Sequence, residues 1–229
     1  MEKNPRFYRV EIDDFNIFKG LIIADFHIGQ FLSIEKEKVA LINCLKSLID
    51  HEKPTHVFIL GDIIHFSSER TDEWYFDFFQ LLEDNFSLPI CIIPGNHDYD
   101  LSPYRNCFNL YKNEKNVKCY DVEFLEIKYS DNFSLFLGHD ASYNMFVHFK
   151  SPIVQWMNEI RNSKYCKSII KKNDVVIFGH THEDIDDDET RNYTIAPFSI
   201  SLEESSYGLI SFNNGFKFDH KTSFSLQSK

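Results

Sequence analysis

The stretch KGLIIADFH, residues 19–27, decides the fold of this chain. Its first six residues form a short apolar run, typical of strands that are buried on both faces. Two more such runs follow, HVFIL at 56–60 and PICII at 89–93, and helical patterns separate the three at about 34–51 and 71–85. Strands that alternate with helices pair in parallel through right-handed crossovers. The first half of the sequence therefore predicts a parallel sheet covered by helices.

The second half predicts shorter strands with antiparallel pairing. β-rich segments lie at 117–120, 124–129, 132–137, 174–178, 193–196, 208–212 and 216–218, with one helical pattern at about 152–171. The two halves together predict an α/β fold in which two packed sheets form a β-sandwich flanked by helices. The 229 residues are enough for one domain with a sizeable core. We therefore expect a single domain over residues 1–229, with a small helical cap at about 141–172.

Each of five buried strands is followed by residues of the types that bind metals. These are Asp25-Phe26-His27, Gly61-Asp62, Gly95-Asn96-His97-Asp98, Gly138-His139 and Gly179-His180-Thr181-His182. Ligands of α/β sheets bind outside the carboxyl ends of the strands, where the loops converge. Imidazole together with carboxylate suits Mn, Fe, Zn and similar divalent ions better than Ca. Two such ions close together need one shared anionic ligand, and Asp62 is the natural candidate.

The order D-F-H, G-D, G-N-H-D, G-H and G-H-T-H, from Asp25 to His182, resembles the calcineurin-like metallophosphoesterase superfamily. The resemblance implies a four-layer αββα sandwich and two divalent ions, either Mn or a mixed pair that includes Fe, Zn, Ni or Co. It implies that Asp25, His27 and His182 bind the first metal, that Asn96, His139 and His180 bind the second, and that Asp62 bridges them. His97 would be the catalytic residue that contacts the phosphate and protonates the leaving group.

One position departs from the phosphoprotein phosphatases of this superfamily, which carry a second acid in the pattern G-D-x-x-D. Here His65 takes that place, and the run G-D-I-I-H is similar to archaeal putative phosphoesterases and bacterial ligase-associated phosphoesterases. Protein phosphatase activity is therefore not expected. His65 is either a contact for the substrate phosphate or a packing residue beside the site. His148, soon after His139, is a second candidate substrate contact.

Charge restricts the partners of this chain. A net charge of −11 and a sequence pI near 5.3 repel a polyanion at long range and argue mildly against nucleic acid. The acidic segment at 183–189, EDIDDDE, either adds to this repulsion or is a solvated loop. A basic cluster lies in the helical pattern at about 152–171 and includes the residue that follows it, and such a cluster is typical of a solvated face. The cluster consists of Arg161, Lys164, Lys167, Lys171 and Lys172.

The five cysteines show no zinc-binding or disulfide pattern, and no apolar run is long enough to cross a bilayer. We therefore expect a cytoplasmic protein. The predicted function is hydrolysis of a compact phosphate ester, a monoester or a diester, by a metal-bound hydroxide. Three alternatives stay open: a metal-dependent nuclease, a UDP-diacylglucosamine-type pyrophosphate hydrolase, and a metal-free protein-interaction scaffold.

Overall fold

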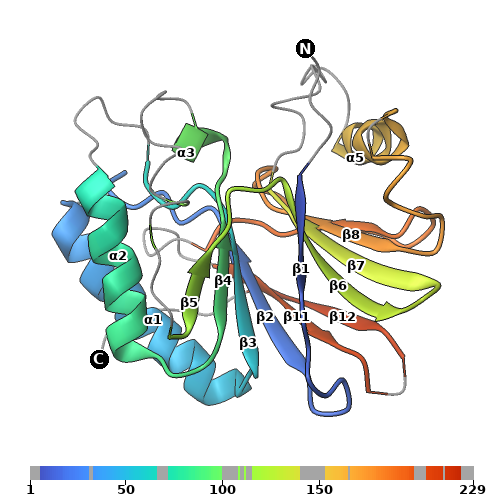
Figure 1. Ribbon diagram of the computed structural model, residues 1–229. Coiled ribbons are helices and arrows are strands. Elements are labelled where there is room, and N and C mark those ends of the chain that lie inside the picture. Colours follow the sequence, from blue (N-terminus) through green and yellow to red (C-terminus); the bar gives the residue numbers. More distant parts are fainter. Residues whose placement is uncertain are drawn as a thin grey trace.

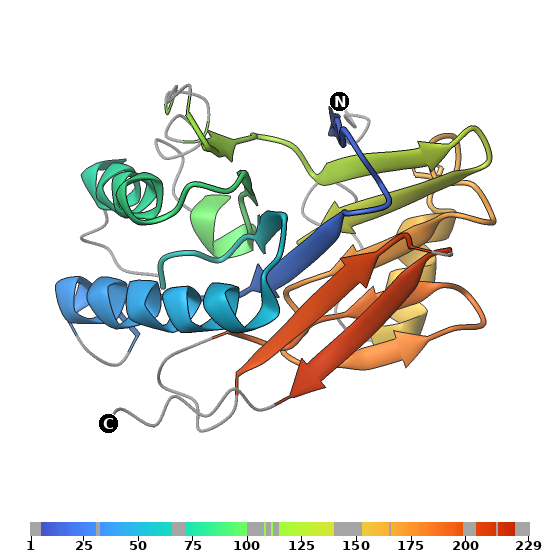
Figure 2. The same ribbon diagram turned by 90° about the horizontal axis from the view of Figure 1, so that it is seen from below.

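The computed structural model of the chain describes residues 6–30, 33–65, 72–99, 108, 111, 115–139, 153–164, 166–198, 205–213 and 215–222. Two six-stranded sheets pack face to face (Figure 1). The helices α1 (Ile34–Glu52) and α2 (Asp72–Asn85) lie outside one sheet, and α5 (Ile153–Asn162) lies outside the other. The view from below places α1 and α2 at one side of the molecule and α5 at the other (Figure 2). The predicted two-sheet α/β sandwich is confirmed.

The sheet beside α1 and α2 is built around the three apolar runs of the first half. Its order is β12-β11-β2-β3-β4-β5. The strands are β2 (Lys19–Ala24), β3 (His56–Leu60), β4 (Ile90–Ile93), β5 (Val117–Cys119), β11 (Ser206–Ser211) and β12 (Lys217–Thr222). β2 to β5 run parallel, and β11 joins the edge of β2 antiparallel. The parallel order follows from the crossovers through α1 and α2, as the sequence predicts.

The second sheet has the order β1-β6-β7-β8-β10-β9. Its strands are β1 (Phe7–Val10), β6 (Phe124–Ser130), β7 (Phe133–Gly138), β8 (Val175–Phe178), β9 (Ile185–Asp187) and β10 (Asn192–Thr194). The sequence did not predict β1 or β9. Both are short edge strands that acquire their structure by pairing with β6 and β10, and a local pattern does not reveal such a pairing.

The helix predicted at 152–171 was too long. α5 ends at Asn162, and described residues beyond it form turns that return to β8. Polar side chains at this end compete for backbone groups: Asn162 Nδ2 donates to the Asn158 carbonyl (2.9 Å), and Ser163 Oγ accepts the Cys166 N–H (3.2 Å). Such local bonds favour helix ends over helix interiors.

Three apolar layers hold the sandwich together. One lies between the two sheets and includes Ile22, Phe58 and Leu137, and the other two lie under the helices on the outer faces. Each central strand is therefore buried on both faces, which explains why its sequence is continuously apolar. Of the predicted cap at 141–172, only residues 153–164 and 166–172 are described, so the cap stays a prediction. Among the described residues, no helix is long and apolar enough to span a membrane.

The layer between the sheets should dominate stability. Phe58 is fully buried there, so Phe58→Ala should lower the free energy of unfolding by about 3–5 kcal/mol, through lost burial and the cavity left behind. Val39→Ala is the matched control, because Val39 is 57% exposed on α1 and should change the free energy by less than about 0.5 kcal/mol. Denaturant unfolding of both variants would measure this. Similar losses in the two variants would contradict the assignment of the core.

Candidate metal centre

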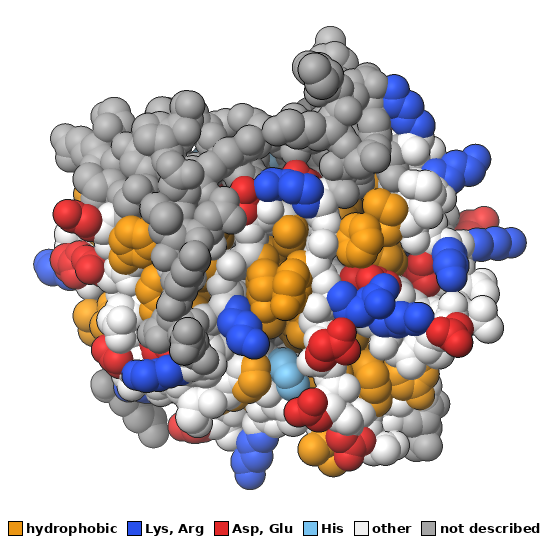
Figure 3. Space-filling model, in the orientation of Figure 1, with side chains coloured by type: hydrophobic (Ala, Val, Ile, Leu, Met, Phe, Trp, Pro, Cys, Tyr) orange, Lys and Arg blue, Asp and Glu red, His pale blue; other side chains and the backbone are white. Residues whose placement is uncertain are grey.

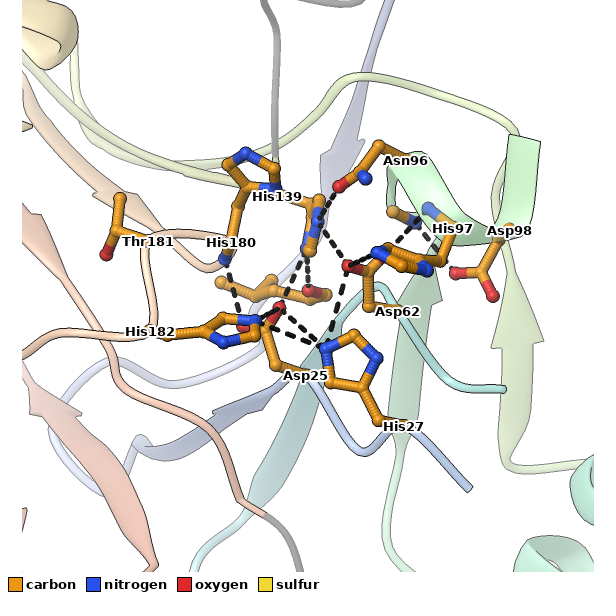
Figure 4. A network of polar contacts seen from close by, with 12 residues as sticks. Asp25, His27, Asp62, Asn96, His97, Asp98, His139, His180, Thr181 and His182 are labelled. Carbon is orange, nitrogen blue, oxygen red and sulfur yellow. Dashed lines mark hydrogen bonds and ion pairs between the residues drawn. The ribbon is translucent and has the colours of Figure 1, made fainter. Parts of the chain in front are cut away.

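The predicted ligand residues meet at one end of the sandwich, beyond the carboxyl ends of β2, β3, β4, β7 and β8 (Figure 4). The loops after β2 and β3 continue the parallel ladder past the strands. The His27 N–H donates to the Asp62 carbonyl (2.9 Å), and the Asp25 N–H donates to the Gly61 carbonyl (3.1 Å). These backbone bonds fix the register between Asp25, His27 and Asp62.

A second set of bonds links the loops of the other sheet to one another and to Asp25. The Gly179 N–H donates to the Gly138 carbonyl (3.1 Å), which places the loops that carry His139 and His180 side by side. The His180 N–H then donates across to Asp25 Oδ2 (2.9 Å). The loops after the neighbouring strands β3 and β4 also approach closely, so that a methyl group at Gly95 would overlap the Asp62 carboxylate. The glycine beside Asn96 is therefore a steric requirement of the site.

Backbone strain is concentrated at the same place. Seven described non-glycine residues have a left-handed backbone, and five of them are predicted ligands. These are Asp25 (φ 58°), His27 (φ 48°), Asp62 (φ 49°), His180 (φ 70°) and His182 (φ 57°). Such conformations cost on the order of 1–3 kcal/mol each and persist only where the surroundings enforce them. Strain of this kind clusters at functional sites, and here it marks the end of the sandwich where the loops converge.

Two of the predicted ligands, Asp25 and Asp62, have buried carboxylates. In each of them one oxygen accepts a hydrogen bond and the other oxygen accepts none. Asp25 Oδ2 accepts the His180 N–H, and Asp62 Oδ1 accepts the His97 N–H (2.8 Å). Asp25 Oδ1 and Asp62 Oδ2 are buried and have no hydrogen-bond partner among the described residues. An isolated buried carboxylate oxygen is costly unless a cation or a donor satisfies it. Both oxygens face imidazole nitrogens (Figure 4).

One group of candidate ligands consists of Asp25, His27 and His182, whose ligand atoms lie within 4.8 Å of one another. The Nε2 atoms of His27 and His182 are 3.2 Å apart, and His182 Nε2 lies 3.5 Å from Asp25 Oδ1. His182 is the most accessible of the three, with 51% of its side chain exposed. The three side chains come from the loops after β2 and β8, so each sheet contributes to this group.

The second group consists of Asp62, His139 and His180, again within 4.8 Å. His139 Nδ1 donates to the Leu60 carbonyl (2.7 Å), which fixes the ring and leaves Nε2 directed at the cluster. His139 Nε2 lies 3.0 Å from Asn96 Oδ1 and 3.3 Å from Asp62 Oδ2. Asp62 Oδ2 is also 3.9 Å from His27 Nε2, so this one oxygen faces both groups.

The carboxylates and imidazoles of the cluster shift one another's pKa values. Burial is the largest influence on His139 and lowers its pKa, but Asp62 and Asp25 outweigh it and raise the pKa to about 10. At His27 burial outweighs the same two carboxylates and lowers the pKa to about 4. Burial raises the pKa of Asp62, yet the neighbouring imidazoles, His139 foremost, hold it well below its usual range. The cluster thus keeps Asp62 ionised and attracts positive charge, as divalent ions would provide.

His97 and His65 lie at the margin of this cluster. The imidazole of His97 is partly exposed, and its Nε2 lies 4.0 Å from Asp62 Oδ2. Its ring stacks against that of His65 (centroids 5.8 Å apart), and both rings lie near His27. Asn96 and His97 open the short helix α3 (Asn96–Tyr99), so the two side chains leave the backbone in different directions, and only Asn96 reaches His139 (Figure 4). His148 lies outside the described residues.

Sequence reasoning missed two residues that organise the site. Asp98 is buried and accepts bonds from the Gly95 N–H (2.8 Å), the Tyr75 hydroxyl (2.8 Å) and the Ile63 N–H (3.3 Å). It therefore ties the loop of Asp62 to the turn that carries Asn96 and His97. Burial, reinforced by Asp62, raises the pKa of Asp98 to about 6. Asp98 is part of G-N-H-D, whereas Tyr75 is one of several aromatic residues on α2 and carries no distinguishing signal.

The acidic segment at 183–189 is mostly engaged within the fold. Asp184 accepts the Ala196 N–H (2.8 Å) and the Ser206 hydroxyl (2.6 Å), and Asp188 accepts the Tyr193 hydroxyl (2.7 Å). The carboxylate of Asp186 lies 2.7 Å from His220 Nδ1. The segment forms β9 and the turn before β10, so several of its carboxylates have structural partners.

The hydrogen bond from the Tyr75 hydroxyl to Asp98 can be tested by removing that hydroxyl. Tyr75→Phe should lower the free energy of unfolding by about 1–3 kcal/mol, because it removes the one hydroxyl among the three donors to the buried Asp98 carboxylate. It should also weaken Mn binding about tenfold or more, since the loops of Asp62 and Asn96 lose their common anchor. Tyr207→Phe is the control, because it removes a 2.8 Å bond to Glu52. Equal Mn affinities in the two variants, measured by calorimetry, would contradict a positioning role.

The chain was compared with known families and structures. A family model described as calcineurin-like phosphoesterase matches residues 18–184. No curated protein matches the chain. Solved structures with similar folds include GAP50, the anchor in the inner membrane complex of Plasmodium, with a TM-score of 0.52 and 13% identity over 92% of this chain and 85% of that chain.

Two further solved structures come from bacteria. One is Yfce, a phosphoesterase from E. coli (TM-score 0.48, 14% identity, 84% of this chain and 87% of that chain). The other is the nuclease MPE from Pseudomonas putida (TM-score 0.42, 16% identity, 85% of both chains). Identities this low carry no information on the activity of this chain, and of the three structures only GAP50, with a TM-score above 0.5, bears on the fold. The family match begins just before β2, ends just before β9 and includes every predicted ligand. The chain therefore belongs to the calcineurin-like phosphoesterase family.

Proposed function

We propose that this protein is a dinuclear metal-dependent hydrolase of compact phosphate esters. One observation carries the proposal: the buried oxygens Asp25 Oδ1 and Asp62 Oδ2 have no hydrogen-bond partner among the described residues and face converging imidazoles. Burying two carboxylates without compensation is unfavourable, so this arrangement is expected only where cations complete it. The family supplies the reaction class, because its members are phosphoesterases.

The ligands divide into two sets. Asp25, His27 and His182 would hold one ion, and Asn96, His139 and His180 would hold the other. Asp62 would serve both, because its Oδ2 atom lies near His27 on one side and His139 on the other. His139 is supported from behind by the Leu60 carbonyl, as metal-binding histidines commonly are.

The donor set restricts the choice of ion. Four imidazoles, two carboxylates and one amide favour Mn, Fe, Zn, Ni or Co, whereas Ca prefers a shell of six to eight oxygens. When bound, two divalent ions would supply Lewis acidity toward the phosphoryl oxygens and would activate water. Two ionised carboxylates neutralise only part of the charge of two such ions, so the site would attract a phosphate group.

The residues at the margin of the cluster would act on the substrate. Hydrolysis forms a bond from water oxygen to phosphorus and breaks the ester P–O bond, and the departing oxygen needs a proton. His97 stands beside Asp62 with its imidazole partly exposed, where a leaving group could reach it. We assign proton donation to His97 and contact with a phosphoryl oxygen to its stacked neighbour His65.

An activity screen of metal-reconstituted protein tests the proposed function. The substrates would be p-nitrophenyl phosphate, its bis-ester, cyclic nucleotides and single-stranded DNA, each with Mn, Co, Ni, Zn, Fe or Ca after chelation. We expect turnover of small esters with transition metals and little with Ca. Asp62→Asn should abolish turnover and most binding of both ions, because the shared charge is lost. Normal turnover with two bound equivalents in Asp62→Asn would exclude the bridge, and cleavage of DNA alone would favour the nuclease.

A variant of His97 tests whether this residue is the proton donor or a metal ligand. His97→Asn should keep both metal equivalents and lose about 10²–10⁴-fold in rate, the usual contribution of a general acid. The loss should shrink for good leaving groups such as p-nitrophenolate, which need little protonation. Elemental analysis and turnover across a series of leaving-group pKa values would measure both effects. A missing metal equivalent would make His97 a ligand, and an equal loss for every leaving group would replace proton donation by electrostatic stabilisation.

A further inference from the structure

A second polar cavity lies away from the candidate metal centre. It has a volume of about 620 Å³ and lies between the end of α5, the turns before β8 and the turn before β10. The residues before β8 and β10 are at the amino ends of these strands, whereas His180 follows the carboxyl end of β8. β8 is four residues long, which separates the two places by about 13 Å at about 3.3 Å per residue. The cavity is therefore distinct from the metal centre.

The cavity concentrates positive charge in an acidic protein. Its lining includes five cationic side chains and two carboxylates, in a chain whose net charge is −11. The cations are Arg161, Lys167, Lys171, Lys172 and Arg191. Four of the five belong to the basic cluster that the sequence predicts to be a solvated helix face. The helical part of that prediction was wrong, because α5 ends at Asn162 and the turns that follow line the cavity, whereas Lys167, Lys171 and Lys172 are exposed as expected.

Within the described part of the chain, the hydrogen bonds of these cations go to neutral groups. Arg161 is buried, and its guanidinium donates to the carbonyls of Lys171, Lys172 and Asp174 (2.7, 3.1 and 2.8 Å) and to Asn192 Oδ1. Lys171 Nζ donates to the Asp131 carbonyl (3.2 Å), and Arg191 lies over the Phe133 ring. Among the described residues, none of the five cations forms a salt bridge within 4.0 Å. The charge of the three exposed lysines, Lys167, Lys171 and Lys172, is therefore available to an external anion, whereas Arg161 is buried and holds the neighbouring carbonyls.

Two nearby carboxylates accept hydrogen bonds from neutral groups. Asp174 accepts the backbone N–H groups of Ser134 (2.8 Å) and Lys171 (2.6 Å), and Asp188 accepts the Tyr193 hydroxyl (2.7 Å). Arg191 also has a left-handed backbone (φ 59°), which is uncommon for a long side chain. Of the seven described non-glycine residues with this conformation, five are predicted ligands, Lys53 caps α1, and Arg191 ends the turn that joins the antiparallel strands β9 and β10.

We propose that this cavity binds a compact polyphosphate anion. Several cations around one hollow match an anion with more than one negative charge. Among the described residues that line the cavity there is no aromatic side chain for a nucleobase and one apolar residue, Ile170, so charged and polar groups dominate this lining. A long nucleic acid would meet the two rim carboxylates Asp188 and Glu189 and the overall negative charge. Lys and Arg side chains gather on the side of the molecule where α5 and β8 lie (Figure 3).

Tripolyphosphate is the probe that tests this site. Its binding would be measured by calorimetry in about 0.15 M salt, near physiological ionic strength, with every variant built on Asp62→Asn so that the metal centre contributes little. Lys167→Gln with Lys172→Gln should weaken binding about tenfold or more, because two charged hydrogen-bond donors are removed. The matched control is Lys46→Gln with Lys217→Gln, which removes the same charge from exposed positions outside the cavity and should leave the affinity unchanged.

Lysine acetylation read by mass spectrometry gives a second measurement that does not depend on substitutions. Tripolyphosphate should protect Lys167, Lys171 and Lys172 and leave Lys46 and Lys217 reactive. Equal affinities in the two double variants, or equal protection of all five lysines, would overturn the proposal and leave a diffuse surface charge. A single-stranded oligonucleotide that binds more tightly than tripolyphosphate, and that loses this affinity in the cavity variant, would replace the compact anion by a nucleic-acid backbone.

Discussion

The hydrogen bond from the His180 N–H to Asp25 Oδ2 is the interaction on which the arrangement of the site depends. Asp25 follows β2, a strand of the sheet beside α1, and His180 follows β8, a strand of the other sheet. The bond therefore joins the loops of two separate sheets at the end where their carboxyl ends meet. It also fixes which oxygen of Asp25 is satisfied by protein and which one is directed at His182. A shift of one sheet along the other would break this bond and separate the two halves of each candidate metal group.

The site uses stability that the rest of the sandwich supplies. Five left-handed ligand residues and two partly unsatisfied carboxylates are each unfavourable by themselves. They are tolerated because the loops extend rigid strands whose both faces are packed, as at Ile22 and Phe58, and because Asp98 gathers three donors around one buried carboxylate. Stability and backbone strain therefore lie in different regions. The apolar layers stabilise the fold, and the loops that carry the predicted ligands contain the strained residues. Divalent ions that bind only the folded chain would raise its free energy of unfolding and so offset part of this strain.

Much of this organisation could be predicted from the sequence, because the signals are local. An apolar run buried on both faces is visible as a run, and a ligand residue directly after it inherits the position of the strand end, as with Ala24 and Asp25. Features that arise from distant pairing could not be predicted. β1 depends on β6, more than a hundred residues away, and Tyr75 on α2 reaches Asp98 through the tertiary fold. The early end of α5 depends on side-chain bonds at Asn162 and Ser163 that the helical pattern conceals.

The two ends of β8 show how one strand can separate opposite charges. Its carboxyl end leads to His180 and to the carboxylates Asp25 and Asp62, where the cluster attracts cations. Its amino end follows Asp174, whose carbonyl together with those of Lys171 and Lys172 surrounds the buried Arg161 guanidinium. A buried cation that is held by carbonyl dipoles keeps its net charge, because dipoles solvate a charge without neutralising it. The acidic composition of the chain therefore does not describe the potential near either end. Net charge governs long-range repulsion, whereas short-range recognition depends on which charges the fold leaves without a counter-ion.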